Sequence, residues 1–270
     1  MQHTINRRGL IAAGSCAAAG SAVGRVKLSS RKKGFCLVPR RDPEWKAKLT
    51  ALNAKWFYSW GTNPPDGVPP FTEFVPMQWG KWSCSAEKLE AVKKAGHKTL
   101  LGFNEPDQKE QANMSVEKAI ELWPRLMDTG LRLGSPAGVH ADGEWMQAFM
   151  QEIDRRGYRV DFICVHSYGG ASARYFMKKL EGWHKRYKRP LWVTEFAVGD
   201  WEANAQKPNK HSPKKILNYM EDALPAMDKS DFVERYAWFS ARPDNHALGT
   251  SALFDEDGAL TPLGEFYASV

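Results

Sequence analysis

The chain has 270 residues, 43% of them hydrophobic and 12% aromatic, which is enough to bury a substantial core in one large domain or two small ones. Its formal charge of +7 would ordinarily suggest a nucleic-acid or membrane-surface partner. Residues 1–33, however, hold seven Lys and Arg and no Asp or Glu, so the rest of the chain is close to neutral. This distribution excludes polyanion binding through the net charge of the folded part, and we predict no nucleic-acid partner.

Residues 1–33 have the pattern of an export signal followed by a basic linker. Arg7 and Arg8 precede an apolar run of small residues that ends near residue 23. Because paired arginines in this position look like a twin-arginine signal, we expect export to the periplasm or the extracellular space. The run is too short and too rich in Gly and Ala to span a membrane, so membrane attachment after export would require lipidation of Cys16. We expect the mature domain over residues 34–270 to be a monomer.

After residue 33, short apolar runs alternate with segments of helical periodicity. Strands are expected at residues 34–38, 55–61, 74–79, 99–105, 132–135, 161–166, 191–195 and 235–240. Helices are expected at residues 43–53, 85–95, 114–129, 145–155, 173–187, 213–227 and 262–268. A loop rich in Pro and Gly occupies residues 62–70, so the helix between the second and third strands is short or absent.

Regular alternation of strands and helices predicts an α/β fold with a parallel sheet. Eight units in this length favour a single closed (β/α)8 TIM barrel, because such barrels commonly occupy ~250 residues. The alternative is an open doubly wound sheet, but no Gly-rich phosphate-binding loop follows the first strand. We find no second domain.

Three cysteines follow the signal, an odd number without metal-ligand spacing. Cys36 and Cys164 lie in apolar strands and are expected to be buried as small hydrophobic residues. A disulfide from one of them to Cys84 stays open.

Two of the predicted strands carry a glutamate near their C-terminal end. The apolar run at residues 100–103 leads to Glu105, and the proline that follows favours extended geometry at this glutamate. The seventh strand has the same form and leads to Glu195. One such glutamate is more often a solvated turn residue, but two on one repeating pattern indicate a paired site.

In a (β/α)8 barrel the active site forms at the C-terminal ends of the strands. The side chains expected there are Trp60, Gln78, Trp79, Asn104, Glu105, Ser135, His166, Tyr168, Glu195 and Trp238. This set has one histidine and no second His or Asp placed to complete a metal site, so a metal-dependent hydrolase is disfavoured and we expect no metal or cofactor.

Two carboxylates in an aromatic-lined cleft fit the cleavage of glycosides. One donates a proton to the leaving oxygen, and the other attacks the anomeric carbon. Indole rings stack on pyranose rings, so the tryptophans at strand ends and in loops are candidates for a sugar-binding surface, with core packing as the alternative. These are Trp60, Trp79, Trp82, Trp201 and Trp238.

An ordered series of short stretches resembles glycoside hydrolase family 128, the compact β-1,3-glucanases. The stretches are WFYSWG at 56–61, FVPMQWG at 74–80, GFNEPD at 102–107, LGSPA at 133–137, HSY at 166–168, WVTEF at 192–196 and WF at 238–239. The Asn104-Glu105-Pro106 element is typical of the larger clan of retaining glycosidases on (β/α)8 barrels. The resemblance covers about residues 34–268.

The resemblance implies that Glu105 is the acid/base and Glu195 the nucleophile of a retaining, endo-acting β-1,3-glucanase. It implies that Asn104 binds the 2-hydroxyl of the sugar in the −1 subsite, that His166 and Tyr168 hold the nucleophile and the sugar, and that Trp238 floors the subsite. In addition, Trp60, Gln78 and Trp79 are expected to bind substrate. A retaining hydrolase of another β-glycan, such as mannan or xylan, and a non-catalytic glucan-binding barrel remain alternatives.

Overall fold

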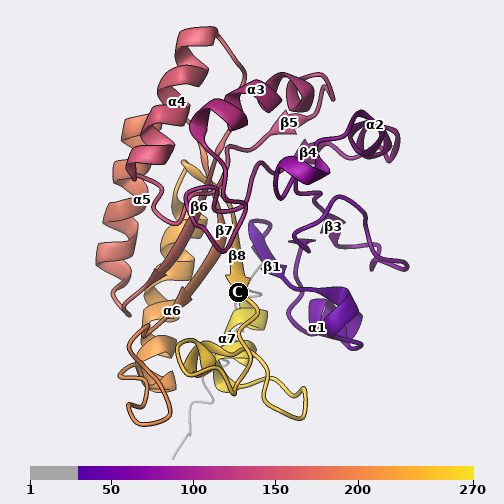
Figure 1. The fold of residues 1–270 in the computed structure, drawn as a ribbon. Coiled ribbons are helices and arrows are strands. Elements are labelled where there is room, and N and C mark those ends of the chain that lie inside the picture. The colour runs from indigo at the N-terminus through magenta and orange to yellow at the C-terminus, as the bar shows by residue number, and fades with distance from the viewer. Residues whose placement is uncertain (1–29) are drawn as a thin grey trace, which may run out of the picture.

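The structure, a computed structural model, describes residues 30–270 and contains eight strands and seven α-helices (Figure 1). The strands are β1 (Lys33–Cys36), β2 (Trp56–Tyr58), β3 (Glu73–Phe74), β4 (Thr99–Leu100), β5 (Arg132–Leu133), β6 (Ile163–Gly169), β7 (Leu191–Val198) and β8 (Val233–Phe239). The helices are α1 (Trp45–Ala51), α2 (Ala86–Lys94), α3 (Val116–Met127), α4 (Glu144–Arg156), α5 (Ala173–Tyr187), α6 (Pro213–Lys229) and α7 (Pro262–Ser269). The predicted export signal, including Cys16, lies outside the described residues.

Parallel pairing closes the strands into a barrel. One sheet has the order β3-β2-β1-β8-β7-β6, and β4 pairs with β5 in a second. Two single bridges join these sheets: Met77 pairs with Leu101 beyond β3 and β4, and Gly134 pairs with Phe162 between β5 and β6. The arc from β3 to β5 is therefore short and irregular, as expected near Pro76, which has no amide hydrogen to donate. The predicted (β/α)8 barrel is confirmed.

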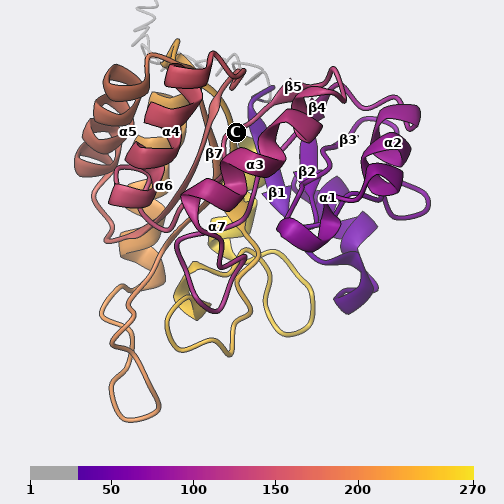
Figure 2. The same cartoon turned by 45° about the horizontal axis from the view of Figure 1, so that its top comes forward.

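The predicted shortening of the second helix is also confirmed, because residues 59–72 between β2 and β3 contain no helix. The remaining helices pack around the barrel, with α4, α5 and α6 grouped along one side (Figure 2). Local signals explain where they begin. For example, the Ser115 side chain accepts a hydrogen bond from the Lys118 amide at the start of α3.

Alternating strand residues divide the core into two layers. The inner layer contains side chains such as Cys36, Trp56, Cys164 and Trp192. The outer layer fills the space between strands and helices. Cys36, Cys84 and Cys164 are buried free thiols, and burial raises the pKa of Cys84 to about 11. No helix among residues 30–270 has the length and apolarity needed to cross a membrane.

The fold begins earlier than the predicted boundary at residue 34. Lys33 is fully buried in β1, and its ammonium donates hydrogen bonds to the carbonyls of Tyr267 (2.7 Å), Ala268 (3.1 Å) and Val270 (2.8 Å). Lys32 donates to the Met227 and Ser230 carbonyls at the end of α6, at 3.1 and 2.7 Å. Lys32 and Lys33, which end the predicted linker, therefore contact the barrel.

Candidate active site

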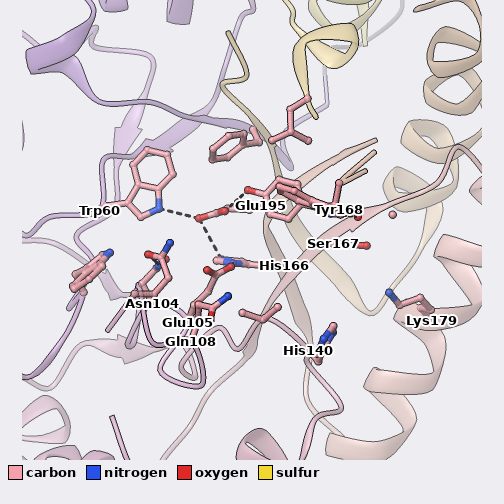
Figure 3. Close-up of a pocket in the computed structure, with 17 residues that line it drawn as sticks. Trp60, Asn104, Glu105, Gln108, His140, His166, Ser167, Tyr168, Lys179 and Glu195 are labelled. Carbon is pink, nitrogen blue, oxygen red and sulfur yellow. Dashed lines mark hydrogen bonds and ion pairs between the residues drawn. The ribbon is translucent and has the colours of Figure 1, made fainter. Parts of the chain in front are cut away.

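A cavity of about 730 Å³ lies at the C-terminal ends of the strands, on the side of the barrel where the loops after β7 and β8 project (Figure 2). It brings together seven of the ten side chains expected at the strand ends. They are Trp60, Trp79, Asn104, Glu105, His166, Tyr168 and Glu195. Figure 3 shows Glu195 among Trp60, Tyr168 and His166, with Glu105 close to His166.

Glu195 is held by hydrogen-bond donors from β2, from the loop that follows β2, and from β6. Its Oε1 accepts hydrogen bonds from the Tyr58 hydroxyl and the Trp60 indole N–H, both at 2.8 Å. Its Oε2 accepts a hydrogen bond from the Tyr168 hydroxyl. The Glu195 residue is only 5% exposed, so these donors replace the water that would otherwise solvate its charge. Burial and the Glu195 charge raise the pKa values of Tyr58 and Tyr168 well above the ordinary tyrosine value, which keeps both hydroxyls protonated as donors.

His166 lies between the two glutamates. Its Nδ1 is 2.9 Å from Glu105 Oε1, and its Nε2 is 3.4 Å from Glu195 Oε1. Burial lowers the pKa of His166, but the Glu195 charge and the hydrogen bond and charge of Glu105 outweigh it, so the net pKa is raised. One oxygen of each glutamate and a histidine nitrogen lie within 4.8 Å of one another.

The backbone at Glu105 differs from the sequence-based prediction. Its φ is +41°, in the left-handed region, whereas the proline after it predicted extended geometry. The Glu105 amide donates to the Ala137 carbonyl at 2.7 Å, and the Glu105 carbonyl accepts from the Gln108 amide at 3.0 Å. Bonds on both sides thus hold the residue in a turn. Trp60 also has a positive φ, +56°, so two residues of the cavity wall have sparsely populated backbone conformations.

Asn104 is 3% exposed, and its amide group faces the cavity. Its Nδ2 donates to Gln111 Oε1 at 3.2 Å. Within residues 30–270 its Oδ1 has no hydrogen-bond partner. Because buried polar atoms are usually paired, this oxygen has the character of an acceptor reserved for a ligand.

Three of the side chains expected at the strand ends do not reach the cavity, and Trp238 is the first. Trp238 is fully buried, donates its indole N–H to the Ser251 carbonyl at 2.9 Å, and packs against Phe196 with ring centroids 4.9 Å apart. The prediction that it floors a subsite is wrong. Its neighbour Phe239 lines the cavity instead, because successive side chains in a strand point to opposite faces.

The same reasoning applies to Gln78, which is fully buried, while Trp79 lines the cavity. Ser135 is buried as well, donating to the Pro136 carbonyl at 2.7 Å and accepting from the Cys164 amide at 3.0 Å. These two residues have internal positions rather than substrate-facing ones.

Tyr58 is a contact residue of Glu195 that the sequence analysis missed. It precedes Trp60 by two residues in the same run, and both donate to the same carboxylate oxygen. The two-residue spacing was the available signal, because strand positions i and i+2 face the same side. On the opposite side from Trp60, the cavity is lined by His140 and Lys179, which no strand-end pattern indicated (Figure 3).

Glu105, His166 and Glu195 are also close enough to hold a metal ion in principle. The contacts of Glu195 argue for a different use. Its two oxygens already accept three hydrogen bonds from neutral donors, and His166 approaches both carboxylates. These donors are suited to a Glu195 carboxylate that is stabilised by hydrogen bonds, and less suited to one that binds a metal ion.

The chain matches the family described as glycosyl hydrolase catalytic core over residues 34–267. It is similar to the crystal structure of a GH128 subgroup I endo-β-1,3-glucanase from Amycolatopsis mediterranei in complex with laminarihexaose. The identity is 37% and the TM-score 0.79, over 89% of this chain and 99% of that one. A GH128 subgroup II endo-β-1,3-glucanase from Sorangium cellulosum is 29% identical with a TM-score of 0.72, over 88% of this chain and 98% of that one.

Among curated proteins, the chain is 28% identical over 251 residues to Alkali-sensitive linkage protein 1 of Schizosaccharomyces pombe. That match covers 89% of this chain but 45% of the relative, so the chain spans less than half of that protein's length. The predicted resemblance to family 128 is confirmed. On its barrel, its paired strand-end glutamates and these matches, the chain belongs to the glycosyl hydrolase catalytic core family, with GH128 β-1,3-glucanases among its relatives.

Proposed function

We propose that the chain hydrolyses β-1,3-glucan with retention of anomeric configuration. The observation that carries this proposal is the pair of glutamates, whose nearest oxygens lie within 4.8 Å in an open cavity. Retaining sites keep their carboxyl groups about 5–5.5 Å apart, whereas inverting sites need about 6.5–9.5 Å to admit a water molecule. The short separation supports double displacement.

The surroundings of the two glutamates support different roles. Glu195 accepts bonds from Tyr58, Trp60 and Tyr168, which stabilise the negative charge that a nucleophile needs. Glu105 contacts His166 and belongs to the cavity wall, where it can protonate the leaving oxygen and then deprotonate the incoming water. In the first step Glu195 bonds to the anomeric carbon while the glycosidic bond breaks and the leaving oxygen takes the proton of Glu105. In the second step water bonds to the anomeric carbon and gives a proton to Glu105, which breaks the bond to Glu195.

The shape of the cleft supports cleavage inside a polymer. A second hollow of about 540 Å³ shares Trp60 and Trp79 with the main cavity and extends over residues 61–65. A glycan longer than the main cavity can therefore continue past these indoles. The similar enzymes from Amycolatopsis and Sorangium are named endo-β-1,3-glucanases. This similarity favours β-1,3-glucan over mannan or xylan as the substrate of this chain, and it favours endo action.

Hydrolysis assays with the Glu195→Gln variant test the proposal against a binding-only barrel. Wild-type protein should release reducing sugar from laminarin and curdlan well above any release from mannan or xylan. The variant should lose about a thousandfold or more in kcat, because the amide cannot attack, yet still bind laminarihexaose in calorimetry. The exposed control Glu256→Gln should retain full activity.

Proton NMR of the first product identifies the stereochemistry. A β-anomer that appears before mutarotation supports retention. An initial α-anomer, or full activity of Glu195→Gln, would disprove the mechanism. Binding of laminarihexaose by the wild type without hydrolysis would establish the non-catalytic alternative.

A further inference from the structure

A buried carboxylate lies just outside the cavity, in the loop of residues 199–212 that follows β7. The Asp200 side chain has no exposed surface. Its Oδ2 accepts the Lys210 amide at 3.1 Å, and its Oδ1 accepts the Lys210 ammonium at 3.0 Å and the Glu202 amide at 3.4 Å. These contacts join the two ends of a long loop through one side chain.

The charge of Asp200 is well stabilised. The Lys210 amide and then the Lys210 ammonium lower the pKa of Asp200 to about 2, so the carboxylate stays ionised at neutral and mildly acidic pH. The Lys210 side chain is 59% exposed, so its ammonium is partly solvated. The Lys210 and Glu202 backbone amides, which also donate to Asp200, belong to the loop itself. The carboxylate therefore acts mainly as a buried acceptor that organises backbone.

The same loop is tied to the loop that follows β8. The Asp200 amide and Asn209 Nδ2 both donate to the Ala247 carbonyl, at 3.0 and 2.8 Å. A Cβ at Gly199 would come within 2.9 Å of a Leu248 methyl carbon, so the two loops approach closely. Leu248 lines the cavity, and so does Trp201 on the other loop.

Trp201 has few contacts of its own to fix it. It is 65% exposed, its indole N–H lies 3.4 Å from the Tyr168 carbonyl, and its ring stands nearly perpendicular to the Tyr168 ring at 5.8 Å. Its position therefore depends on the backbone of the adjacent residue, which is Asp200.

We propose that Asp200 is a positioning residue that holds Trp201 and Leu248 together as one wall of the cleft. It sets the affinity for the sugar units that lie along this wall and leaves the bond-breaking step at Glu105 and Glu195 unchanged. This inference rests on the proposed glucanase function and adds to it a determinant of substrate affinity that does not touch substrate.

A double-mutant cycle between Asp200→Ala and Trp201→Ala tests the inference. With laminarihexaose, Asp200→Ala should raise KM about tenfold and leave kcat within about twofold. This result is expected when a lost interaction had stabilised the bound substrate and the transition state equally. Trp201→Ala should do the same, and the double variant should be no worse than either single variant, because both remove the same wall.

A matched control comes from the same loop. Glu202→Gln removes an exposed ion pair to Lys207, whose side chains are 70% and 55% exposed, and should leave both constants unchanged. The same double-mutant cycle can be measured by calorimetry in a Glu195→Gln background, in which laminarihexaose binds but is not cleaved. A lower affinity of the Asp200→Ala variant there would show a loss of binding that does not depend on the catalytic step.

Either of two results would overturn the inference. The first is a kcat and KM of Asp200→Ala equal to those of the wild type, and the second is a double variant whose loss of affinity is the full sum of the two single losses. If Asp200→Ala does not fold by circular dichroism, Asp200→Asn takes its place in the cycle, because it keeps the size of the side chain and removes the charge that pairs with the Lys210 ammonium. A wild-type chain that neither cleaves nor binds the glucan would refute the proposed function instead, and that result is seen before any Asp200 variant is measured.

Discussion

At the scale of single residues, His166 links the two glutamates that the proposed reaction needs. Its ring nitrogens lie 2.9 Å from Glu105 and 3.4 Å from Glu195. The charges of both glutamates therefore act on the imidazole, and together they raise its pKa against the effect of burial. Any change at one glutamate should be visible at the histidine.

We predict that Glu195→Gln lowers the pKa of His166. Burial disfavours the imidazolium, and the Glu195 charge is the largest contribution that opposes burial, so its removal leaves desolvation less compensated. The histidine Cε1–H signal in an NMR pH titration, assigned with His166→Gln, measures the shift. The exposed control Glu256→Gln should not move it. An unchanged or higher pKa in Glu195→Gln would show that Glu195 does not sustain the imidazolium.

At the scale of elements, β1 and α7 form the seam where the barrel closes on itself. The Lys33 ammonium donates to three carbonyls at the end of α7. The Tyr267 hydroxyl on α7 donates to the Gly34 carbonyl at 2.6 Å and accepts from the Trp238 amide at 3.3 Å. One helix therefore holds both β1 and β8.

Replacing Lys33 by Met should lower the free energy of unfolding by about 1–3 kcal/mol, because buried carbonyls lose their donor. Denaturant unfolding measures this loss, and Lys93→Met on the exposed face of α2 is the control. A loss no larger than in the control would mean that water replaces the ammonium at the seam.

The difference in stability between wild type and Lys33→Met should also depend on pH. Burial lowers the pKa of Lys33 from 10.5 to about 8, so between these values the unfolded chain binds more protons than the folded one. The contribution of Lys33 to stability should therefore rise from pH 8 to pH 10.5, and the difference between wild type and Lys33→Met should widen over that range. A difference that is constant with pH would contradict the lowered pKa.

At the scale of the whole molecule, residues 1–33 hold seven of the 38 Lys and Arg and no Asp or Glu, so this segment accounts for the net charge of +7, and we propose that it directs export. Replacing Arg7 and Arg8 with lysine preserves the charge and removes the arginine pair, so a twin-arginine route should lose its exported fraction. Immunodetection of the chain in cell and exported fractions measures the effect, with Arg31→Lys as the control. Undiminished export of the double variant would exclude the twin-arginine route.

Features that depend on local interactions are predictable from this sequence, whereas features that depend on long-range contacts are not. The helix at residues 114–129 was predicted well, because its cap at Ser115 and its apolar face are local signals. Trp238 and Gln78 were assigned to the cavity, although the structure gives that place to their neighbours Phe239 and Trp79. A displacement of one residue along a strand moves a side chain to the other face, and the composition of an apolar run does not distinguish the two faces.

The eight-unit barrel, the family resemblance and the strand positions of Glu105 and Glu195 all follow from the order of residues along the chain. Only the folded molecule shows that these glutamates meet at His166 and that Tyr58 joins Trp60 on Glu195. The same holds for the place of Lys33 in the barrel and for the positive φ of Glu105. Periodicity and caps act between residues a few positions apart, whereas the active site is formed by contacts such as that of Tyr58 with Glu195, which depend on strand register and barrel closure.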